Sequence, residues 1–268
     1  MTTTQIPPSV TRPATGTESE APTHAIIGQR VPKIEGTEKV TGKAQYGADQ
    51  SRPNMLWARH LGSTHAHARI VSIDTAAARA YPGVHAVLTG DDLPGIIAAI
   101  SGTDPTPEEW DIPSRGKRIL AWKKVVFHNE PVAVVAAITP TAAEEALALI
   151  TVEYEALPVV LDPEVSMKPG ATLLHDGVFT ETFNGKARTP SNVAKVTEMA
   201  KGDVDDALTH APVRVNASFR TAMVHQGYIE PQACLAEYAP DGRFSIWTST
   251  QGSFGVRSGL AGFMKVPP

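Results

Sequence analysis

The chain has 268 residues, 42% of them hydrophobic, and a formal net charge of −4 at pH 7. This composition indicates a globular protein with one large domain or two smaller ones. The slightly acidic balance argues against a nucleic-acid partner, because phosphate binding relies on clustered Lys and Arg. No apolar run is long enough to cross a bilayer, and the N-terminus lacks the pattern of a secretory signal, so we expect no membrane partner and a cytoplasmic location.

Residues 1–25 are expected to form a disordered tail, because they are rich in Thr, Pro, Ser and Glu and bury too little apolar surface to offset their ordering entropy. The pattern changes from Ile26 onward. Residues 70–73 alternate between apolar and polar, which predicts a half-buried strand. Asp74 is then placed to cap a short helix over residues 75–80, and residues 84–88 predict the next strand.

Residues 93–118 contain scattered Gly, Pro and charged residues, which predict a long irregular excursion with Trp110 as its anchor. The β-branched residues at 125–127 and 132–138 predict two buried strands. The polar residues 128–130 between them predict a turn.

The clearest predicted helix follows, with Thr139 as N-cap and Pro140 at the first helical position. Helical spacing predicts an apolar stripe, formed by Ala142, Ala146, Leu149 and Ile150. Residues 152–154 then begin another strand. This strand–helix–strand alternation predicts a mixed α/β domain over residues 26–163.

The remaining chain is expected to form a connector over residues 164–200 and a second domain that begins at residue 201. Within that domain residues 202–208 predict a short helix. Residues 213–219 alternate cleanly, with Val, Val, Ala and Phe on one face, which predicts a strand. Residues 235–238 and 244–248 predict an antiparallel pair across a Pro-Asp-Gly turn, and a further helix begins near Phe254.

Cys234 is the only cysteine. An internal disulfide is therefore excluded, and so is an iron–sulfur cluster held by this chain alone, since such clusters normally take four thiolates. We expect this thiol to be buried and inert.

Two C-terminal motifs carry a family resemblance. Residues 224–231 (VHQGYIEP) and 248–251 (TSTQ) resemble the molybdenum-binding large subunit of the xanthine dehydrogenase/aldehyde oxidase family. Further segments follow the order of that family: 41–49 (TGKAQYGAD), 64–70 (THAHARI), 81–89 (YPGVHAVLT), 130–136 (EPVAVVA), 142–147 (AAEEAL) and 201–204 (KGDV). The resemblance covers only the first third of a typical large subunit.

The resemblance implies an α/β (α+β) fold class, with a hammerhead-type mixed domain followed by a truncated first part of a molybdopterin-binding domain. It assigns Gln251 to the cofactor, as a glutamine that hydrogen-bonds the apical oxo ligand of molybdenum. It also implies a molybdopterin cytosine dinucleotide in the completed enzyme, with 2Fe–2S and FAD on partner subunits.

The family's terminal catalytic glutamate lies beyond Pro268, so we expect no catalytic residue and no metal ligand on this chain. The expected function is the N-terminal part of a molybdenum hydroxylase large subunit, inactive without the remainder of that subunit. The alternative is a non-catalytic truncated fragment or interaction module.

The sequence gives weaker support for other kinds of functional site. Glu230 beside His225 could form a catalytic pair, but a carboxylate at this point is expected to support the fold. His65 and His67 share a face but have no further His/Cys cluster nearby to complete a zinc site. Ser253 with His225 lacks the nucleophile elbow of a hydrolase, and Gly36, Gly42 and Gly47 do not have the spacing of a phosphate loop.

Overall fold

The computed structural model describes residues 26–28, 30–102 and 119–268, which divide between two units, residues 1–46 and 47–268. The expected tail and the proposed anchor Trp110 lie outside the described residues. In the first unit a short helix, α1 (Gly36–Val40), carries an ion pair between Lys39 Nζ and Glu35 Oε1 at 3.3 Å.

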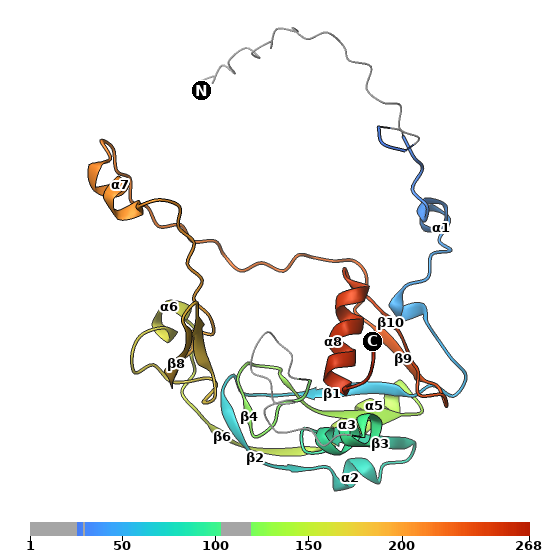
Figure 1. Ribbon diagram of the computed structural model, residues 1–268. Helices are drawn as coiled ribbons and strands as arrows, with labels where there is room; N and C mark the ends of the chain where they lie inside the picture. The colour runs from blue at the N-terminus through green and yellow to red at the C-terminus, as the bar shows by residue number, and fades with distance from the viewer. Residues whose placement is uncertain (1–25, 29, 103–118) are drawn as a thin grey trace, which may run out of the picture. The chain divides into compact units, whose positions relative to one another are not determined.

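The second unit begins with η1 (Gly47–Asp49) and continues into a two-sheet body, residues 57–156 (Figure 1). Its first sheet has the antiparallel order β1-β5-β3, and its second has the antiparallel order β4-β2-β6. The strands are β1 (Trp57–Gly62), β2 (Ala68–Asp74), β3 (Val84–Thr89), β4 (Lys124–Val125), β5 (Pro131–Ala137) and β6 (Thr151–Ala156), and the helices are α2 (Ala76–Arg79), α3 (Leu93–Ser101) and α5 (Pro140–Leu147).

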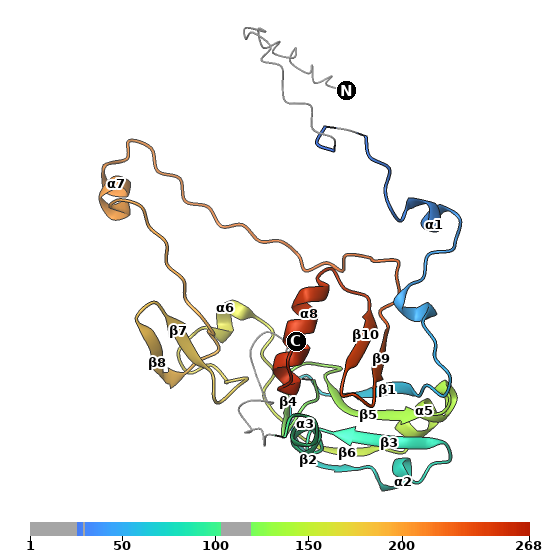
Figure 2. The ribbon, with the colours of Figure 1, turned by 45° about the vertical axis from the view of Figure 1, so that its right-hand side comes forward.

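The core of the two-sheet body lies on both faces of β5, because successive side chains of a strand point to opposite faces and β5 is apolar at every position. Val135 and two alanines of β5 pack against α5 and α2 in one cluster, and Val132 packs into a second cluster under the other sheet. Figures 1 and 2 both show α5 lying against the β1-β5-β3 sheet. The first cluster is rich in alanine, so the helix and sheet approach closely: Ala78, Val87, Ala133, Val135, Ala137, Ala143, Ala146 and Ile150.

The N-termini of two helices, α5 and α2, are capped by the residues that the sequence predicts. Thr139 Oγ1 accepts a hydrogen bond from Ala142 N at 3.0 Å, which confirms the predicted N-cap of α5. Asp74 Oδ1 accepts from Ala76 N at 2.9 Å at the start of α2. The predicted stripe is wrong at its end, because α5 ends at Leu147 and both Leu149 and Ile150 lie outside the helix. Leu149 is exposed, whereas Ile150 and Ala143 are buried.

Two predictions on this body need correction. Residues 93–101 form α3 rather than an irregular excursion, with Pro94 in its first turn and Gly102 in the left-handed conformation at its C-cap, φ 69°. The strand predicted over residues 125–127 stops at Val125. The chain leaves the ladder there because the amide of Val126 donates to Glu130 Oε2 at 2.7 Å, which closes the predicted turn.

The rest of the second unit contains smaller elements. These are α6 (Pro163–Ser166), the antiparallel hairpin β7 (Phe179–Thr182) and β8 (Gly185–Pro190), α7 (Val204–His210), the antiparallel hairpin β9 (Cys234–Tyr238) and β10 (Phe244–Thr248), and α8 (Ser253–Met264). The β9–β10 hairpin and the helix near Phe254 are as predicted. The segment treated as a connector contains a hairpin of its own.

The strand predicted over residues 213–219 does not form in the described structure. Its backbone makes no hydrogen bond to any other described residue, and its apolar side chains are exposed. A strand is defined by its ladder, and no other described segment pairs with this one.

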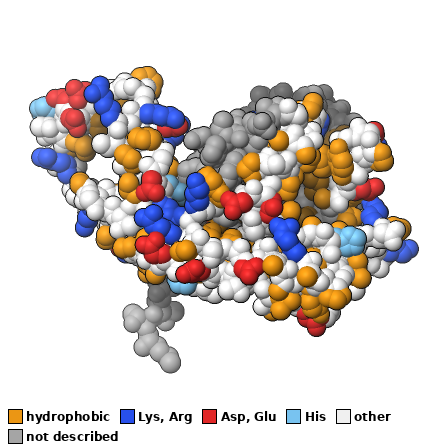
Figure 3. Space-filling model, turned by 90° about the horizontal axis from the view of Figure 1, so that it is seen from below, with side chains coloured by type: hydrophobic (Ala, Val, Ile, Leu, Met, Phe, Trp, Pro, Cys, Tyr) orange, Lys and Arg blue, Asp and Glu red, His pale blue; other side chains and the backbone are white. Residues whose placement is uncertain are grey.

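The surface has mixed character. On the face shown in Figure 3, hydrophobic, acidic and basic side chains are interspersed, and neither sign of charge dominates. Among the described residues, every helix is too short or too polar to cross a bilayer.

Candidate functional site

The two C-terminal motifs meet in the structure. Ser249 Oγ donates a hydrogen bond to Glu230 Oε1 at 2.9 Å, although the two residues are 19 positions apart. The backbone amide of Ser249 also donates to Ala233 O at 3.4 Å. The loop that leaves β10 is therefore attached to the loop that enters β9.

Gly47 packs against this junction from far away in the sequence. A Cβ atom added at Gly47 would lie 2.8 Å from the backbone oxygen of Ala233 and 3.1 Å from Ser249 Oγ. Only a residue without a side chain allows this approach. The segment around Gly47 is thus part of the frame that holds the 248–251 motif.

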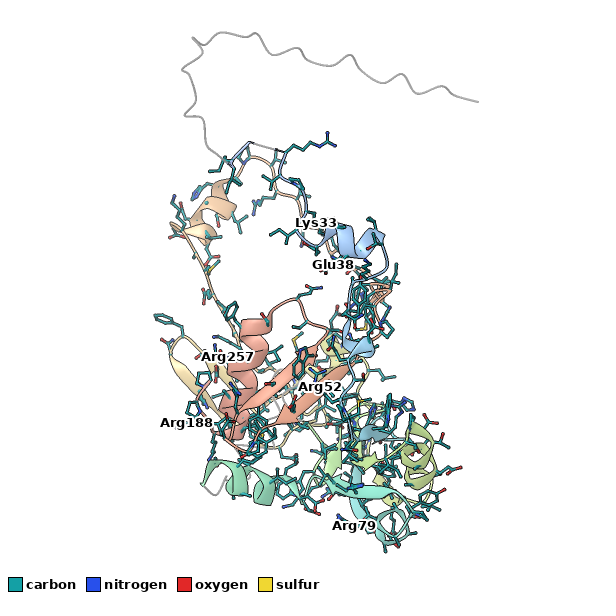
Figure 4. The ribbon with its side chains drawn as sticks, turned by 90° about the vertical axis from the view of Figure 1, so that its right-hand side faces the viewer. Lys33, Glu38, Arg52, Arg79, Arg188 and Arg257 are labelled. Carbon is teal, nitrogen blue, oxygen red and sulfur yellow. The ribbon has the colours of Figure 1, made fainter. Side chains whose placement is uncertain are left out.

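Arg52 extends the same frame on the hairpin. Its guanidinium carbon lies 4.4 Å from the ring centroid of Trp247, and its Nε lies 3.6 Å from Glu237 Oε2. Figure 4 shows Arg52 beside the β9–β10 hairpin. A cation over an indole ring adds a modest attraction at an exposed site. Two segments about 190 residues apart in sequence therefore contact each other around β10.

Gln251 follows this frame directly. It is exposed and lies two residues before α8, and no side-chain hydrogen bond connects its amide to another described residue. Its neighbours are restrained: Thr250 Oγ1 accepts from Gly252 N at 3.1 Å, and Ser249 is bonded to Glu230. The chain thus presents an uncharged donor whose backbone is fixed and whose amide is free for a ligand.

Glu230 and His225 do not form a pair. Glu230 binds Ser249, while His225 Nδ1 accepts from Gly227 N at 3.0 Å and its ring lies 4.9 Å from that of Tyr228. Both residues therefore stabilise the local loop, which is the structural interpretation given to this carboxylate above. Ser253 is the first residue of α8, and no hydrogen bond joins it to His225.

His65 and His67 have separate structural environments. The ring of His65 packs on Tyr154 with centroids 4.7 Å apart, and the buried His67 shares a hydrogen bond of 2.7 Å between Nδ1 and Pro158 O. Within the described residues, no three His, Cys, Asp or Glu side chains gather in a way that could hold a metal ion.

The expectation of a buried cysteine is wrong. Cys234 is exposed on β9, opposite Thr248 of β10. A two-stranded hairpin leaves one face uncovered unless another element packs on it, so the apolar character of a thiol does not ensure burial there.

A hollow of about 710 Å³ lies elsewhere in the second unit, with Arg69, Trp122 and Lys124 in its lining. Lys124 Nζ donates to Asp176 Oδ2 at 2.9 Å, and both residues line the hollow. This bond, with smaller contributions from Arg69 and His175, lowers the pKa of Asp176 below its ordinary value. Gln251 does not line this hollow.

Gly47 and Arg52 belong to the site's frame although the local sequence does not predict their contacts. The motif that contains Gly47 was recognised, but nothing in its local pattern indicates a contact with residues 233–249. Only the folded chain brings these segments together.

Two family models match the chain. Residues 41–158 match the aldehyde oxidase and xanthine dehydrogenase a/b hammerhead domain, and residues 186–268 match the molybdopterin cofactor-binding domain. Together they cover the two-sheet body and the junction that holds Gln251. The second match begins inside the segment treated above as a connector.

Similar proteins of known name and a solved structure point to the same family as these models. The chain is 32% identical to the nicotinate dehydrogenase large molybdopterin subunit of Eubacterium barkeri, covering 91% of this chain and 52% of that one. It is 35% identical to the nicotine 6-hydroxylase large subunit of Paenarthrobacter nicotinovorans, covering 90% and 28%. The crystal structure of quinoline 2-oxidoreductase from Pseudomonas putida 86 superposes with a TM-score of 0.69 at 31% identity, covering 88% and 28%.

This chain thus spans about half of the first relative and little more than a quarter of the other two. The mixed helix-and-strand fold with small sheets matches these large subunits, in keeping with the predicted fold class. The chain belongs to the xanthine dehydrogenase/aldehyde oxidase family and corresponds to the N-terminal part of its molybdopterin-binding large subunit.

Proposed function

We propose that this chain is the N-terminal part of the large subunit of a molybdenum hydroxylase, an oxidoreductase that hydroxylates an aldehyde or an N-heterocycle with water as the oxygen source. The cofactor-binding domain match supports a molybdenum cofactor. The names of the relatives that act on nicotinate, nicotine and quinoline support the N-heterocycle class. Activity requires the rest of the large subunit.

Gln251 is the residue of this chain that we propose to contact the cofactor. Its exposed amide follows a backbone held by the Ser249–Glu230 bond and by the hydrogen bond from Gly252 N to Thr250 Oγ1. An uncharged N–H donor at a restrained position suits an oxo ligand, because it orients that ligand without adding charge to the site. The cofactor, when bound, supplies the redox chemistry of the hydroxylation. Gln251 donates a hydrogen bond, and Ser249, Glu230 and Gly47 hold the loop that positions it.

The proposal includes cofactors and partners beyond this chain. The pterin is proposed as molybdopterin cytosine dinucleotide, and electrons leave through 2Fe–2S and FAD groups on partner subunits. The single Cys234 supports this division, because one thiolate does not hold an iron–sulfur cluster. The description of the relatives as large subunits also supports separate partners.

The test is a Gln251→Ala variant in the assembled complex. Molybdenum per complex is measured by mass spectrometry, and turnover is measured with nicotinate, quinoline and an aldehyde. We expect a loss of turnover of roughly tenfold or more, the range found for orienting groups around metal sites. Gln232→Ala is the matched control, because Gln232 is also exposed and lies outside both motifs. Unchanged metal content and turnover in Gln251→Ala would remove Gln251 from the site.

The second candidate is a non-catalytic fragment or interaction module. The exposed apolar side chains of residues 213–229 favour this reading, since such surface is typical of a binding segment. Purification of the chain with bound partner subunits but without molybdenum would favour it over the hydroxylase.

A further inference from the structure

The hollow of about 710 Å³ carries an excess of positive charge on its lining. Among the described residues that line it, Arg69, Lys123 and Lys124 are cationic, and Asp176 is acidic. The carboxylate of Asp176 accepts a hydrogen bond from Lys124 Nζ at 2.9 Å, so these two charges offset each other. Arg69 Nε lies 3.3 Å from Glu155 Oε2, in an exposed ion pair outside the lining. The described lining therefore has three cations and one carboxylate.

Two of these cations are neighbours across a β ladder. Arg69 of β2 and Lys124 of β4 are directly paired in the antiparallel register. Side chains at such a pair lie on the same face of the sheet and close together, so like charges there destabilise the pairing. Strand pairing alone thus disfavours this arrangement, whereas an anion bound beside both side chains would offset the repulsion.

The third cation, Lys123, belongs to a strained turn. Its φ is 61°, and Lys124 N donates to Trp122 O at 2.7 Å across it, as in the rare form of γ-turn with positive φ. The carbonyl of Lys123 accepts from Ile70 N at 2.8 Å, which fixes the turn to β2. Lys123 Nζ lies 3.7 Å from the centroid of the Trp122 ring and makes no ion pair with a described residue. Residues strained in this way cluster at active sites and ligand clamps.

A buried histidine lies in the same lining. His67 is 2% exposed, and its Nδ1 lies 2.7 Å from Pro158 O. Because a carbonyl oxygen only accepts, Nδ1 donates in this bond. The other ring nitrogen, Nε2, is also buried and hydrogen-bonds to no described residue. Such an atom is uncommon in folded proteins, and a bound ligand is one group that satisfies it.

We propose that this hollow binds a phosphate group, free or as the monoester of a small molecule, through Arg69, Lys123 and Lys124. A phosphate group at neutral pH carries nearly two negative charges, which match the excess of two cations in the lining. The forked guanidinium of arginine fits phosphate oxygens, and lysine binds them as a point charge. The volume lies within the range of small-molecule pockets, so it leaves room for a group attached to the phosphate.

The experiment titrates the whole chain with inorganic phosphate, adenosine monophosphate and adenosine, and calorimetry measures each dissociation constant. The ionic strength is held constant, because added salt would screen the charges. We expect adenosine, which lacks the phosphate group, to bind roughly tenfold or more weakly than adenosine monophosphate. Tighter binding of adenosine monophosphate than of inorganic phosphate would identify a phosphorylated small molecule as the ligand. Equal or weaker binding would identify the free ion.

Two substitutions should change the affinity for phosphate in opposite directions. Lys123→Asn removes a cation and introduces a residue type that tolerates positive φ, so binding should weaken roughly fivefold or more. Asp176→Asn removes the carboxylate that competes for Lys124, so binding should become tighter by about the same factor. Lys201→Asn is the matched control, because Lys201 is exposed and does not line the hollow. It should leave the affinity unchanged.

Several results would overturn the inference. The native chain would bind neither phosphate nor adenosine monophosphate, or it would bind adenosine as tightly as the monophosphate. Equal weakening by Lys123→Asn and Lys201→Asn would indicate attraction to the whole surface rather than to the hollow. If Lys123→Asn does not fold, Asp176→Asn decides alone, and an affinity that is unchanged or lower in that variant contradicts the site.

Discussion

β5 and the unpaired segment, residues 213–219, both contain valines, but β5 is buried and the unpaired segment is exposed. In β5, Val132 and Val135 are fully buried between two core clusters. In the unpaired segment, Val213 and Val215 are almost fully exposed. β5 is apolar at every position and packs on both faces, whereas the unpaired segment alternates apolar with polar residues, and the two also differ in their strand neighbours. β5 has β1 and β3 on its two edges, and the unpaired segment has no described neighbour.

The difference shows which part of the chain is self-sufficient. The two-sheet body closes its own ladders and buries its own apolar face. The part from residue 201 onward contains one hairpin and two helices, and it leaves Val213, Phe219, Ile229 and Phe254 largely in solvent. A two-stranded sheet alone is marginal in water. We therefore expect the free energy of unfolding to come mainly from the two-sheet body.

The largest expected effect comes from the same substitution, isoleucine to alanine, made in the two-sheet body and in the part from residue 201 onward. Ile97 in α3 is 1% exposed, and Ile229 before β9 is 98% exposed. Ile97→Ala should lower the free energy of unfolding by about 2–5 kcal/mol, because it removes buried methyl groups and leaves a cavity. Ile229→Ala should change it by less than about 0.5 kcal/mol. Chemical denaturation of both variants measures this, and a similar loss in the two would contradict the division.

Gly47→Ala tests whether the C-terminal junction is tightly packed despite its exposed surroundings. Its new Cβ meets the backbone oxygen of Ala233, which has no freedom to rotate away. We expect a destabilisation of about 1–3 kcal/mol for this overpacking, seen as faster amide exchange around residues 230–251. Gly259→Ala in α8 is the control, since a Cβ there meets nothing within 4 Å and should stabilise the helix slightly. Equal behaviour of the two would mean that the junction is loose.

Removal of a helix N-cap should lower the unfolding free energy of the whole chain in the two-sheet body, but should affect only the helix itself in the part from residue 201 onward. Thr139 caps α5 in the core, and Asp203 Oδ1 accepts from Asp206 N at 2.9 Å to cap the exposed α7. Thr139→Ala should cost about 1 kcal/mol of unfolding free energy. Asp203→Ala should speed amide exchange within α7 and leave the unfolding midpoint in place. A midpoint shift in Asp203→Ala would show that α7 is coupled to the core.

Sequence reasoning succeeded where the signal is local. The Thr139-Pro140 cap, the turn before β5, the β9–β10 hairpin and the start of α8 all depend on residues within a few positions of each other. It failed where a distant partner decides. Residues 213–219 lack their ladder, and Cys234 lacks a cover. The helix α3 is a different case, because its signals are local: Pro94 in its first turn and Gly102 at its C-cap.

In the candidate site, too, the local signal is predictable from the sequence and the long-range contacts are not. Gln251 was predicted from its motif, and its role remains a proposal. The contacts that hold its loop, from Gly47, Arg52 and Glu230, connect residues 19 to about 200 positions apart. Such contacts depend on the folded path of the chain, so no periodicity or short motif could have indicated them.

The smallest expected effect concerns the Lys124–Asp176 pair, which joins β4 to the segment after the two-sheet body. The hydrogen bond from Lys124 lowers the folded-state pKa of Asp176 below its ordinary value of 3.8. The pair therefore stabilises the folded chain above that value, and the contribution is lost as pH falls through the lowered folded-state pKa. Asp176 is mostly exposed, so solvent screening limits the contribution to less than about 1 kcal/mol.

Asp176→Asn should lower the unfolding free energy slightly at neutral pH and have no effect in strong acid, where the native carboxyl is also neutral. Asp241→Asn, which alters an ion pair within the β9–β10 turn, is the matched control. A difference between Asp176→Asn and the native chain that persists unchanged into strong acid would assign the effect to packing rather than to charge, and the segment after β6 would then be held to the body by its shape alone.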